Sequence, residues 1–444
     1  MKNIASRMFY YLVPQWIQER LEEHFGNEGL KKYVRNTTWA LAAKVISVLV
    51  SFVVTIYLVR YLGPENYGKL SYAVSFLSIF AVISNLGIDS VLYRELIVYP
   101  EKRNVYLGSA FIIKLCASLL ATVLTILGAL LFAKDDVSQL IIIILSGTFV
   151  FKALYIIVYE FQANVQQKYP AIASLCVVLI LNILKIGVIT FDKGILYMGV
   201  ILLIESILFA TLLVYIRIKH YGSFHKWSYD KKIILSILKD SWPFIFIALF
   251  TSIYSRIDQV ALRHMVDASA VGIYDAAVRI VEVWFFIPGL ITASLFPAIV
   301  NSKIISIAEY KKRLFSLIGF LVGSSIIIAA ITSLIAKPLI ATLYGPDFIQ
   351  SASVFSIYIW AGIFISINTV LYYYLLNENK QKLIFFTSLG TMILNIVLNI
   401  LLIPHLGVIG AAWATLISYT ILILPIIKII KHKEETGIVL PLVK

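Results

Sequence analysis

Charged residues and cysteines are scarce in this chain of 444 residues. Asp, Glu, Lys and Arg together make up 14% of the sequence, roughly half of what a soluble domain carries, so an ordinary soluble fold is excluded. The two cysteines, Cys116 and Cys176, both lie in apolar runs, where small core residues are expected rather than a disulfide or a metal pair. The sequence thus indicates neither a disulfide framework nor a cysteine metal site.

Clustered catalytic side chains and long outward loops are also lacking. His264 and His405 each stand alone in short predicted outward connections. A membrane enzyme such as a polysaccharide polymerase or an acyltransferase needs a His, Asp or Glu constellation or a long outward loop. We therefore predict that the protein is not an enzyme. No soluble basic module with interleaved aromatic residues indicates nucleic-acid binding either.

What the chain has in abundance is apolar sequence: 60% of its residues are hydrophobic and the mean hydropathy is +0.90. About twelve runs are long enough to cross the hydrocarbon core as helices. The provisional spans are 39–62, 69–93, 108–133, 137–160, 170–191, 194–217, 241–263, 270–297, 314–336, 339–376, 383–403 and 407–430. The tenth is too long for one crossing, so we expect a surface turn at Tyr344-Gly345-Pro346-Asp347 and a true helix from about Ser351. The predicted fold is an all-α polytopic membrane protein of about twelve transmembrane helices.

The positive charges indicate the orientation. Of the 38 Lys and Arg residues, about 26 fall in the termini and in the connections after even-numbered spans, and about six fall on the opposite side. Because cytoplasmic connections carry the excess of Lys and Arg, both termini are predicted to be cytoplasmic. The net charge of +14 then reflects this bias and attraction to anionic lipid headgroups.

The chain resembles itself when it is shifted by about 203 to 204 positions. Trp39 then coincides with Trp242, and Gly68 with Gly272. Six spans in each half give the halves the same topology, which is typical of parallel repeats with a cargo site between them. The predicted division is an N-terminal lobe at 36–218, a cytoplasmic linker at 219–240, a C-terminal lobe at 241–432 and a cytoplasmic tail at 433–444.

The first 35 residues have an amphipathic pattern. Ile17, Leu21 and Phe25 recur every four residues, with Gln and Glu side chains opposite. This pattern predicts a helix that lies on the cytoplasmic membrane surface at 1–35, with an unstructured tail as the alternative.

Six basic residues lie within the predicted spans, away from their terminal residues: Lys44, Lys114, Lys152, Lys185, Arg256 and Arg279. A basic side chain near the bilayer centre costs roughly 2.5–3.5 kcal/mol, so such residues usually face a bundle interior or a watery cavity. We interpret the six as the lining of a cationic cavity for an anionic cargo. Lys44 and Lys114, close to the cytoplasmic ends of their spans, also fit snorkelling, whereas Lys185 lies deeper.

Acidic residues accompany the bases in the second half. Asp275, Arg279 and Glu282 lie at i, i+4 and i+7, which places them on one helix face. A face with three charges is not expected to contact lipid. They either neutralise one another and stabilise the helix, or take part in cargo binding or ion coupling. Asp258 lies about 200° around its helix from Arg256, and we hypothesise that it pairs with Arg279 at similar depth.

Two further features are candidates for coupling and motion. Asp89 and Glu205 are also embedded, and any of the buried carboxylates could exchange a proton once burial disfavours its charge. Pro288-Gly289 interrupts the eighth span near its middle, which predicts a static bend or a hinge.

Several short segments follow one another in a particular order along the chain. They are 35–39 (RNTTW), 60–68 (RYLGPENYG), 86–89 (LGID) followed by Arg94-Glu95, 255–260 (SRIDQV), 343–348 (LYGPDF) and 410–415 (GAAWAT). In their order and spacing these segments resemble polysaccharide-unit flippases of the multidrug/oligosaccharidyl-lipid/polysaccharide exporter superfamily. The resemblance covers nearly the whole chain after the predicted surface helix.

The resemblance implies a two-lobed flippase that carries a polyprenyl-(pyro)phosphate-linked oligosaccharide from the cytoplasmic to the outer leaflet of the cell membrane. It implies alternating access, no cofactor, and a product used for O-antigen, capsule or exopolysaccharide. Membrane lipids and polysaccharide polymerase machinery are the further partners it implies. The basic lumen of the family maps onto Arg256 and Arg279, with Lys44, Lys114 and Lys185 as weaker counterparts.

Two relatives in the same superfamily are alternatives. Multidrug or cation antiporters often carry a coupling Asp in the first span, where this chain has Lys44 and no acid. Lipid II flippases usually have fourteen spans.

Overall fold

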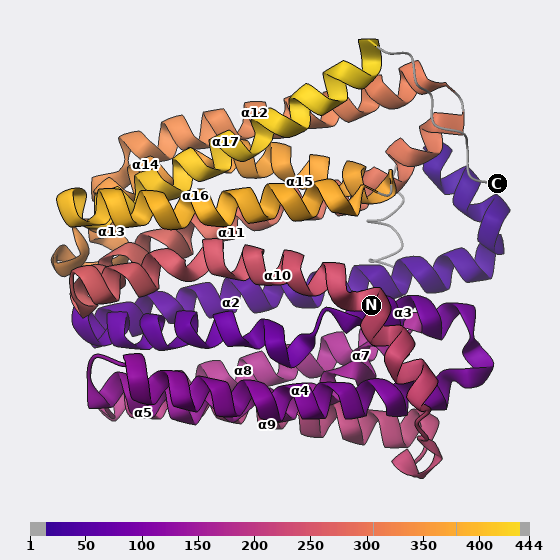
Figure 1. The fold of residues 1–444 in the computed structure, drawn as a ribbon, viewed down its shortest axis with the longest axis horizontal. Coiled ribbons are helices and arrows are strands. Elements are labelled where there is room, and N and C mark those ends of the chain that lie inside the picture. Colours follow the sequence, from indigo (N-terminus) through magenta and orange to yellow (C-terminus); the bar gives the residue numbers. More distant parts are fainter. Residues whose placement is uncertain (1–14, 305, 379, 436–444) are drawn as a thin grey trace. The chain divides into compact units, whose positions relative to one another are not determined.

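A computed structural model describes residues 15–304, 306–378 and 380–435, which form helices joined by short turns, with no strand among them (Figure 1). The first-half helices are α2 (Gln15–Asn85), α3 (Ile88–Val98), α4 (Arg103–Phe132), α5 (Asp136–Ser146), α6 (Thr148–Lys152), α7 (Ile156–Ala163), α8 (Lys168–Thr190) and α9 (Leu196–Tyr221). Then follow α10 (Lys231–Met265), α11 (Ala268–Asn301), α12 (Ile307–Leu334), α13 (Ala336–Tyr344), α14 (Ser351–Tyr358), α15 (Ala361–Asn377), α16 (Gln381–Leu406) and α17 (Val408–Glu435). The predicted all-α fold is confirmed.

The ends of the chain are covered in part. Of the predicted surface helix, residues 1–14 lie outside the described residues, and the rest is helical as the beginning of α2. Of the predicted tail, residues 436–444 also lie outside them.

Most helices have the length and composition of membrane spans. Nine described helices pass this test, or ten if the bent pair α14 and α15 is one span. The first candidate, Ala42–Val98, has 57 residues, about 85 Å of straight helix against a core of about 30 Å. Gly63 within it has a φ of 66° and precedes Pro64, so the right-handed helix cannot run straight through this point. The count of twelve and the orientation stay predictions.

The expected interruption of the tenth span is present. α13 ends at Tyr344, Gly345 takes a φ of 91°, a 3-10 turn follows at Pro346–Phe348, and α14 begins at Ser351. The helix then bends by 41° between α14 and α15.

One boundary differs from expectation. α10 begins at Lys231, ten residues before the predicted span, because Asp230 accepts a hydrogen bond from the Lys232 N–H at 2.8 Å and so starts the helix inside the polar connection. The predicted span 137–160 is present as the candidate span Asp136–Ala163, in which α5, α6, a 3-10 turn at Ala153–Tyr155 and α7 follow one another.

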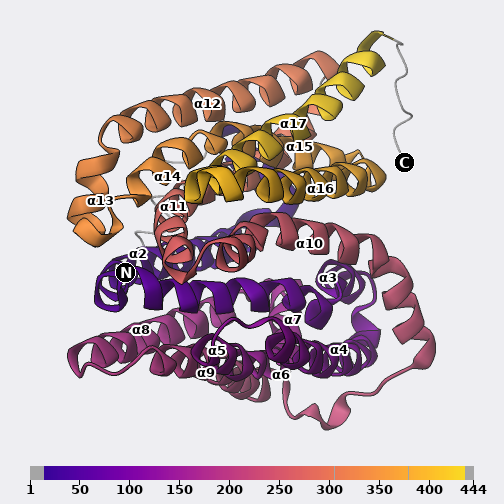
Figure 2. The ribbon, with the colours of Figure 1, turned by 60° about the vertical axis from the view of Figure 1, so that its left-hand side comes forward.

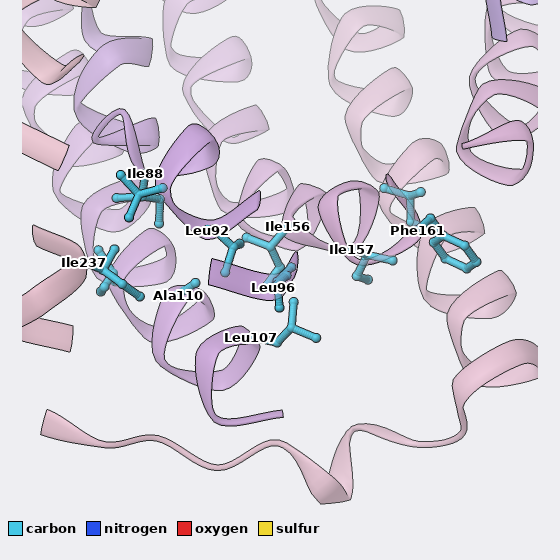
Figure 3. Packing of buried hydrophobic residues seen from close by; sticks show 12 residues of the cluster. Ile88, Leu92, Leu96, Leu107, Ala110, Ile156, Ile157, Phe161 and Ile237 are labelled. Carbon is cyan, nitrogen blue, oxygen red and sulfur yellow. The ribbon is translucent and has the colours of Figure 1, made fainter. Parts of the chain in front are cut away.

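The chain divides into two compact units. The first contains the described residues up to Leu62 and Phe76–Ile245, and the second contains Gly63–Ser75 and the described residues from Phe246 onward. The lobe boundaries proposed from sequence stay a prediction. In the first unit, buried residues of α3, α4, α7 and the start of α10 form a core that includes Leu92, Leu107 and Phe161 (Figure 3).

The second unit is built from α11 to α17 with most of α10. Its buried apolar residues form clusters on α11, α12 and α15, and on α10, α15, α16 and α17. Helices α16 and α17 pack side by side (Figure 2).

Within the second unit, the segment Gly63–Ser75 crosses the start of α11 at very close range. A Cβ atom on Gly68 would collide with the carbonyl oxygen of Ala268, and one on Gly272 would collide with that of Pro64. Both pairs are related by the repeat offset of 204 positions, since 64 corresponds to 268 and 68 to 272. The contact is therefore reciprocal, as at a twofold axis, and it needs glycine at both positions.

Candidate functional site

Asp275 on α11 is a buried carboxylate of the second unit that accepts hydrogen bonds from several side chains. Its side chain is 1% exposed. It accepts hydrogen bonds from the Tyr67 hydroxyl at 2.6 Å, the Ser71 hydroxyl at 2.8 Å, Nε2 of Gln259 at 2.7 Å and Nε of Arg279 at 3.2 Å. Four donors offset the loss of water around a buried carboxylate. Asp275 is thus a fixed anion that holds the neighbouring arginine in place.

Arg279 lies one turn further along α11. Its side chain is 36% exposed, and its ion pair with Asp275 confirms that the two residues share a helix face. Since Nε is engaged by Asp275, the guanidinium is anchored at its base.

Arg256 on α10 pairs with Glu282 on α11 at 3.1 Å. Their side chains are 24% and 34% exposed. Glu282 also interacts electrostatically with Arg279. We call Arg256, Asp275, Arg279 and Glu282 the α10–α11 charge array. It contains two positive and two negative charges, all within helices apolar enough to span a membrane.

Asp258 lies apart from this array among buried polar side chains, a cluster that we call the Asp258 pocket. Asp258 is 3% exposed and accepts hydrogen bonds from the hydroxyls of Tyr274 at 2.6 Å and Thr415 at 2.5 Å and from Nδ2 of Asn399 at 2.6 Å. The hypothesised pairing with Arg279 is wrong, because α10 turns Asp258 toward α16 and α17 while Arg279 is held by Asp275.

The Asp258 pocket also contains the side-chain oxygen atoms of two asparagines. Nδ2 of Asn399 also lies 3.1 Å from Oδ1 of Asn395. Among the described residues, Oδ1 of Asn399 is buried without a hydrogen-bond partner. The pocket is therefore a carboxylate surrounded by neutral oxygen-bearing side chains. No group of three or more His, Cys, Asp or Glu side chains with metal-site geometry occurs in the described parts of the chain.

In the first unit, Lys114 and Asp89 form an ion pair at 2.5 Å. The Lys114 side chain is 4% exposed, Nδ2 of Asn85 donates to the same carboxylate at 2.6 Å, and the Lys114 ammonium lies 5.7 Å from the centre of the Tyr159 ring. Snorkelling therefore does not describe Lys114. The signal in the sequence was that Asp89 and Lys114 lie at similar depth near the cytoplasmic ends of consecutive predicted spans.

The three other lysines predicted to line the cavity differ in exposure. Lys152 is half-buried, 5.8 Å from the Phe149 ring centre, and interacts electrostatically with Glu205. Lys44 is exposed and Lys185 is half-buried.

The predicted bend or hinge lies inside a continuous helix. α11 remains helical through Pro288 and Gly289. A Cβ atom on Gly289 would meet nothing within 4 Å. The hinge stays a prediction.

Sequence reasoning missed a second buried ion pair in the first unit. Glu160 and Arg217, 0% and 1% exposed, lie 2.9 Å apart. The Arg217 guanidinium also donates to the carbonyl of Gly222 and lies under 5 Å from the ring centres of Phe224 and Trp227. This arrangement ties the end of α9 to the connection that follows it.

The neutral donors around the two carboxylates of the second unit were also missed. They are Tyr67, Ser71, Gln259, Tyr274, Asn399 and Thr415. Among them, the spacing of Asn395 and Asn399, four residues apart in an apolar span, was the one available signal.

Residues 33–303 match the model of a family described as "Polysaccharide biosynthesis protein". A "Probable flippase AglR" from Haloferax volcanii is 31% identical over 183 residues, a match that covers 38% of this chain and 36% of that protein. In this match the chain spans about a third of the relative's length.

The fold is shared with solved transporters. A structure described as "Lipid II flippase MurJ, inward closed conformation" matches with a TM-score of 0.74 at 17% identity, over 88% of this chain and 87% of that chain. An inward-facing multidrug resistance MATE family transporter of the MOP superfamily matches with a TM-score of 0.66 at 13% identity, over 88% and 96%. At these identities the likeness concerns the fold.

Proposed function

We propose, from the premise that this multi-pass membrane protein belongs to the polysaccharide biosynthesis protein family, that it is a flippase for lipid-linked oligosaccharides. Its cargo would be an oligosaccharide on a polyprenyl (pyro)phosphate, moved from the cytoplasmic to the outer leaflet of the cytoplasmic membrane for O-antigen, capsule or exopolysaccharide synthesis. Polysaccharide polymerase machinery would use the product. The fold of a lipid II flippase and the match to a probable flippase support this proposal.

The observation that carries the proposal is the α10–α11 charge array. Arg279 is partly exposed although it lies within a helix apolar enough to span a membrane. An arginine that faced lipid there would cost several kcal/mol, so we propose that it faces a hydrated transport route. The guanidinium binds phosphate oxygens through a planar fork of donors, which suits a pyrophosphate. Lys44, Lys152 and Lys185 are proposed to add positive charge for the cargo, whereas the charge of Lys114 is offset by Asp89.

The energetics favour outward transport of such a cargo. A pyrophosphate with about two negative charges gains about 2.3 kcal/mol per charge for each 100 mV of inside-negative potential. The main barrier is the desolvation of phosphate and sugars, which a hydrated basic route removes. The lipid tail meets no such barrier and stays in the bilayer during alternating access.

Ion coupling through the Asp258 pocket is a second part of the proposal. Among the described residues, Asp258 has no basic partner, and its hydrogen-bond partners are neutral hydroxyls and amides. A buried carboxylate without a counter-charge is stabilised by a bound proton or by a small cation. The oxygen atoms of Asn395 and Asn399 are of the kind that a hard cation prefers. Ions that enter this pocket would then bias the transport cycle.

The test is leaflet exchange of a fluorescent polyprenyl-pyrophosphate oligosaccharide in liposomes that contain the purified protein. We expect the wild type to accelerate the exchange, and Arg256→Ala and Arg279→Ala to slow it about tenfold or more, because each removes a charged contact to phosphate. Arg313→Ala is the matched control, since that arginine pairs with Glu309 at the start of α12, outside the array.

Two outcomes would favour the alternatives. If the wild type moves a cationic dye but leaves the lipid-linked oligosaccharide in place, a multidrug or cation antiporter is the better assignment, which the MATE-like fold allows. If it moves lipid II and no other oligosaccharide lipid, a lipid II flippase is the better assignment, which the MurJ-like fold allows.

A further inference from the structure

The α10–α11 charge array is neutral as it stands, which matters for an anionic cargo. Arg279 is paired with Asp275, and Arg256 is paired with Glu282. An incoming phosphate therefore meets no net positive charge, and a new ion pair with either arginine needs one existing carboxylate to withdraw.

The two carboxylates are held very differently. Asp275 is 1% exposed and accepts four hydrogen bonds from side chains of three segments. Glu282 is 34% exposed, and among the described residues its ion-pair partner is Arg256 alone. Removal of Asp275 would take the acceptor away from four donors, three of them buried, whereas withdrawal of Glu282 exchanges one partly exposed ion pair for hydration. Glu282 is thus the carboxylate that can leave.

We infer that Glu282 is the resident counter-ion of Arg256 and that the phosphate of the cargo displaces it. This inference rests on the proposed function, because it takes the cargo to be a phosphate-bearing lipid. In the protein without cargo, the Glu282 carboxylate forms an ion pair with the Arg256 guanidinium. When the cargo binds, a phosphate oxygen replaces the Glu282 carboxylate, while Asp275 keeps Arg279 in place as a second contact.

The exchange gives Glu282 a role in release as well as in selectivity. Because the carboxylate stays tethered one helix away from Arg256, it competes with the bound phosphate at high effective concentration. This competition weakens binding and helps the cargo to leave. It also disfavours small monovalent anions, which form fewer contacts with the two arginines than a pyrophosphate does. Glu282 is therefore a residue that sets affinity and selectivity.

The experiment measures binding of a fluorescent farnesyl diphosphate analogue to the full-length protein in nanodiscs of zwitterionic lipid. We expect Glu282→Gln to bind the probe about threefold to fivefold more tightly than the wild type, since it frees Arg256 from a partly exposed ion pair. Glu309→Gln is the matched control, because it removes a carboxylate from the Glu309–Arg313 pair outside the array. Its affinity should stay within about 1.3-fold of the wild type, below the changes expected for the Glu282 variants.

A double-mutant cycle separates exchange at Arg256 from a general charge effect. In an Arg256→Ala background, Glu282→Gln should give less than half of its gain in the wild-type background, because the guanidinium that forms the ion pair with Glu282 is absent. An equal gain in both backgrounds, or unchanged or weaker binding by Glu282→Gln alone, overturns the inference.

Two further controls keep the result decisive. If Glu282→Gln is not recovered folded, Glu282→Asp keeps the charge but shortens the reach to Arg256. Its affinity for the probe should rise about twofold, and unchanged affinity overturns the inference. The transport proposal is judged separately by leaflet exchange. Tighter binding by Glu282→Gln without exchange by any variant would support the counter-ion role and refute the flippase.

Discussion

Ser71 donates a hydrogen bond to Asp275 at 2.8 Å, and the two residues lie 204 positions apart. That separation is the offset of the internal repeat, so the two residues occupy equivalent positions in the two halves. The same offset relates Gly68 to Gly272, which lie in the crossing one turn earlier. The repeat has thus diverged where it contacts itself: one copy carries the hydroxyl donor and the other carries the carboxylate that orders Arg279.

The glycine crossing predicts a steric effect. Gly68→Ala and Gly272→Ala would each place a methyl group against a backbone carbonyl that has little room to move. We expect each to destabilise the folded protein by about 1–3 kcal/mol, measured as a lower thermal midpoint in detergent. Gly319→Ala on α12 is the control, because its Cβ would meet nothing within 4 Å. Equal midpoints for all three variants would contradict the crossing.

The Asp275 network predicts that its neutral donors matter. Tyr67→Phe removes one hydroxyl and leaves its ring in place, so the buried carboxylate loses a donor. We expect the free energy of unfolding to fall by about 1–3 kcal/mol. Tyr215→Phe, on a tyrosine that is 62% exposed, should change it by less than about 0.5 kcal/mol. Tyr67→Phe should also slow leaflet exchange, since Arg279 is less firmly placed. A Tyr67→Phe protein with wild-type stability would argue against the network.

The Lys114–Asp89 pair predicts strong coupling. Lys114→Met leaves the Asp89 carboxylate without its cation and should cost about 3–5 kcal/mol of stability. Addition of Asp89→Asn should recover part of that loss, so the double variant should be more stable than Lys114→Met alone. The same cycle on the more exposed pair of Glu309 and Arg313 should give a coupling below about 1 kcal/mol. Additive losses at Lys114 and Asp89 would show that the pair is not coupled.

The Asp258 pocket predicts a link to ion gradients. Asp258→Asn keeps a polar side chain of the same size but removes the charge that a proton or cation would neutralise. We expect exchange by this variant to be independent of imposed proton and sodium gradients, whereas the wild-type rate responds to one of them. Thr415→Val, which removes a hydroxyl at 2.5 Å from Asp258, should weaken that response. A variant Asp258→Asn with the full wild-type response would exclude this pocket as the coupling site.

The apolar pattern of the chain was sufficient to predict the helices and several of the turns that interrupt them. Apolar runs of bilayer length form helices because every backbone polar group must be satisfied within the segment. The turn after Tyr344 and the helix from Ser351 followed from local chemistry. The Asp275–Arg279 pair was equally predictable, because residues i and i+4 of one helix are neighbours whatever surrounds them.

The hydrogen bonds between polar groups of different helices depend on how the helices pack, which the pattern of residues did not predict. Tyr67 and Asn399 are ordinary residues in their own segments and become ligands of a carboxylate through helix packing. For the same reason, helical angle alone did not identify the partner of Asp258: the angle gives the direction of a side chain, but the neighbour in that direction depends on contacts between segments distant in sequence. Local periodicity therefore predicted the helices and their faces, and long-range packing decided which charged side chains are buried and hydrogen-bonded and which stay partly exposed.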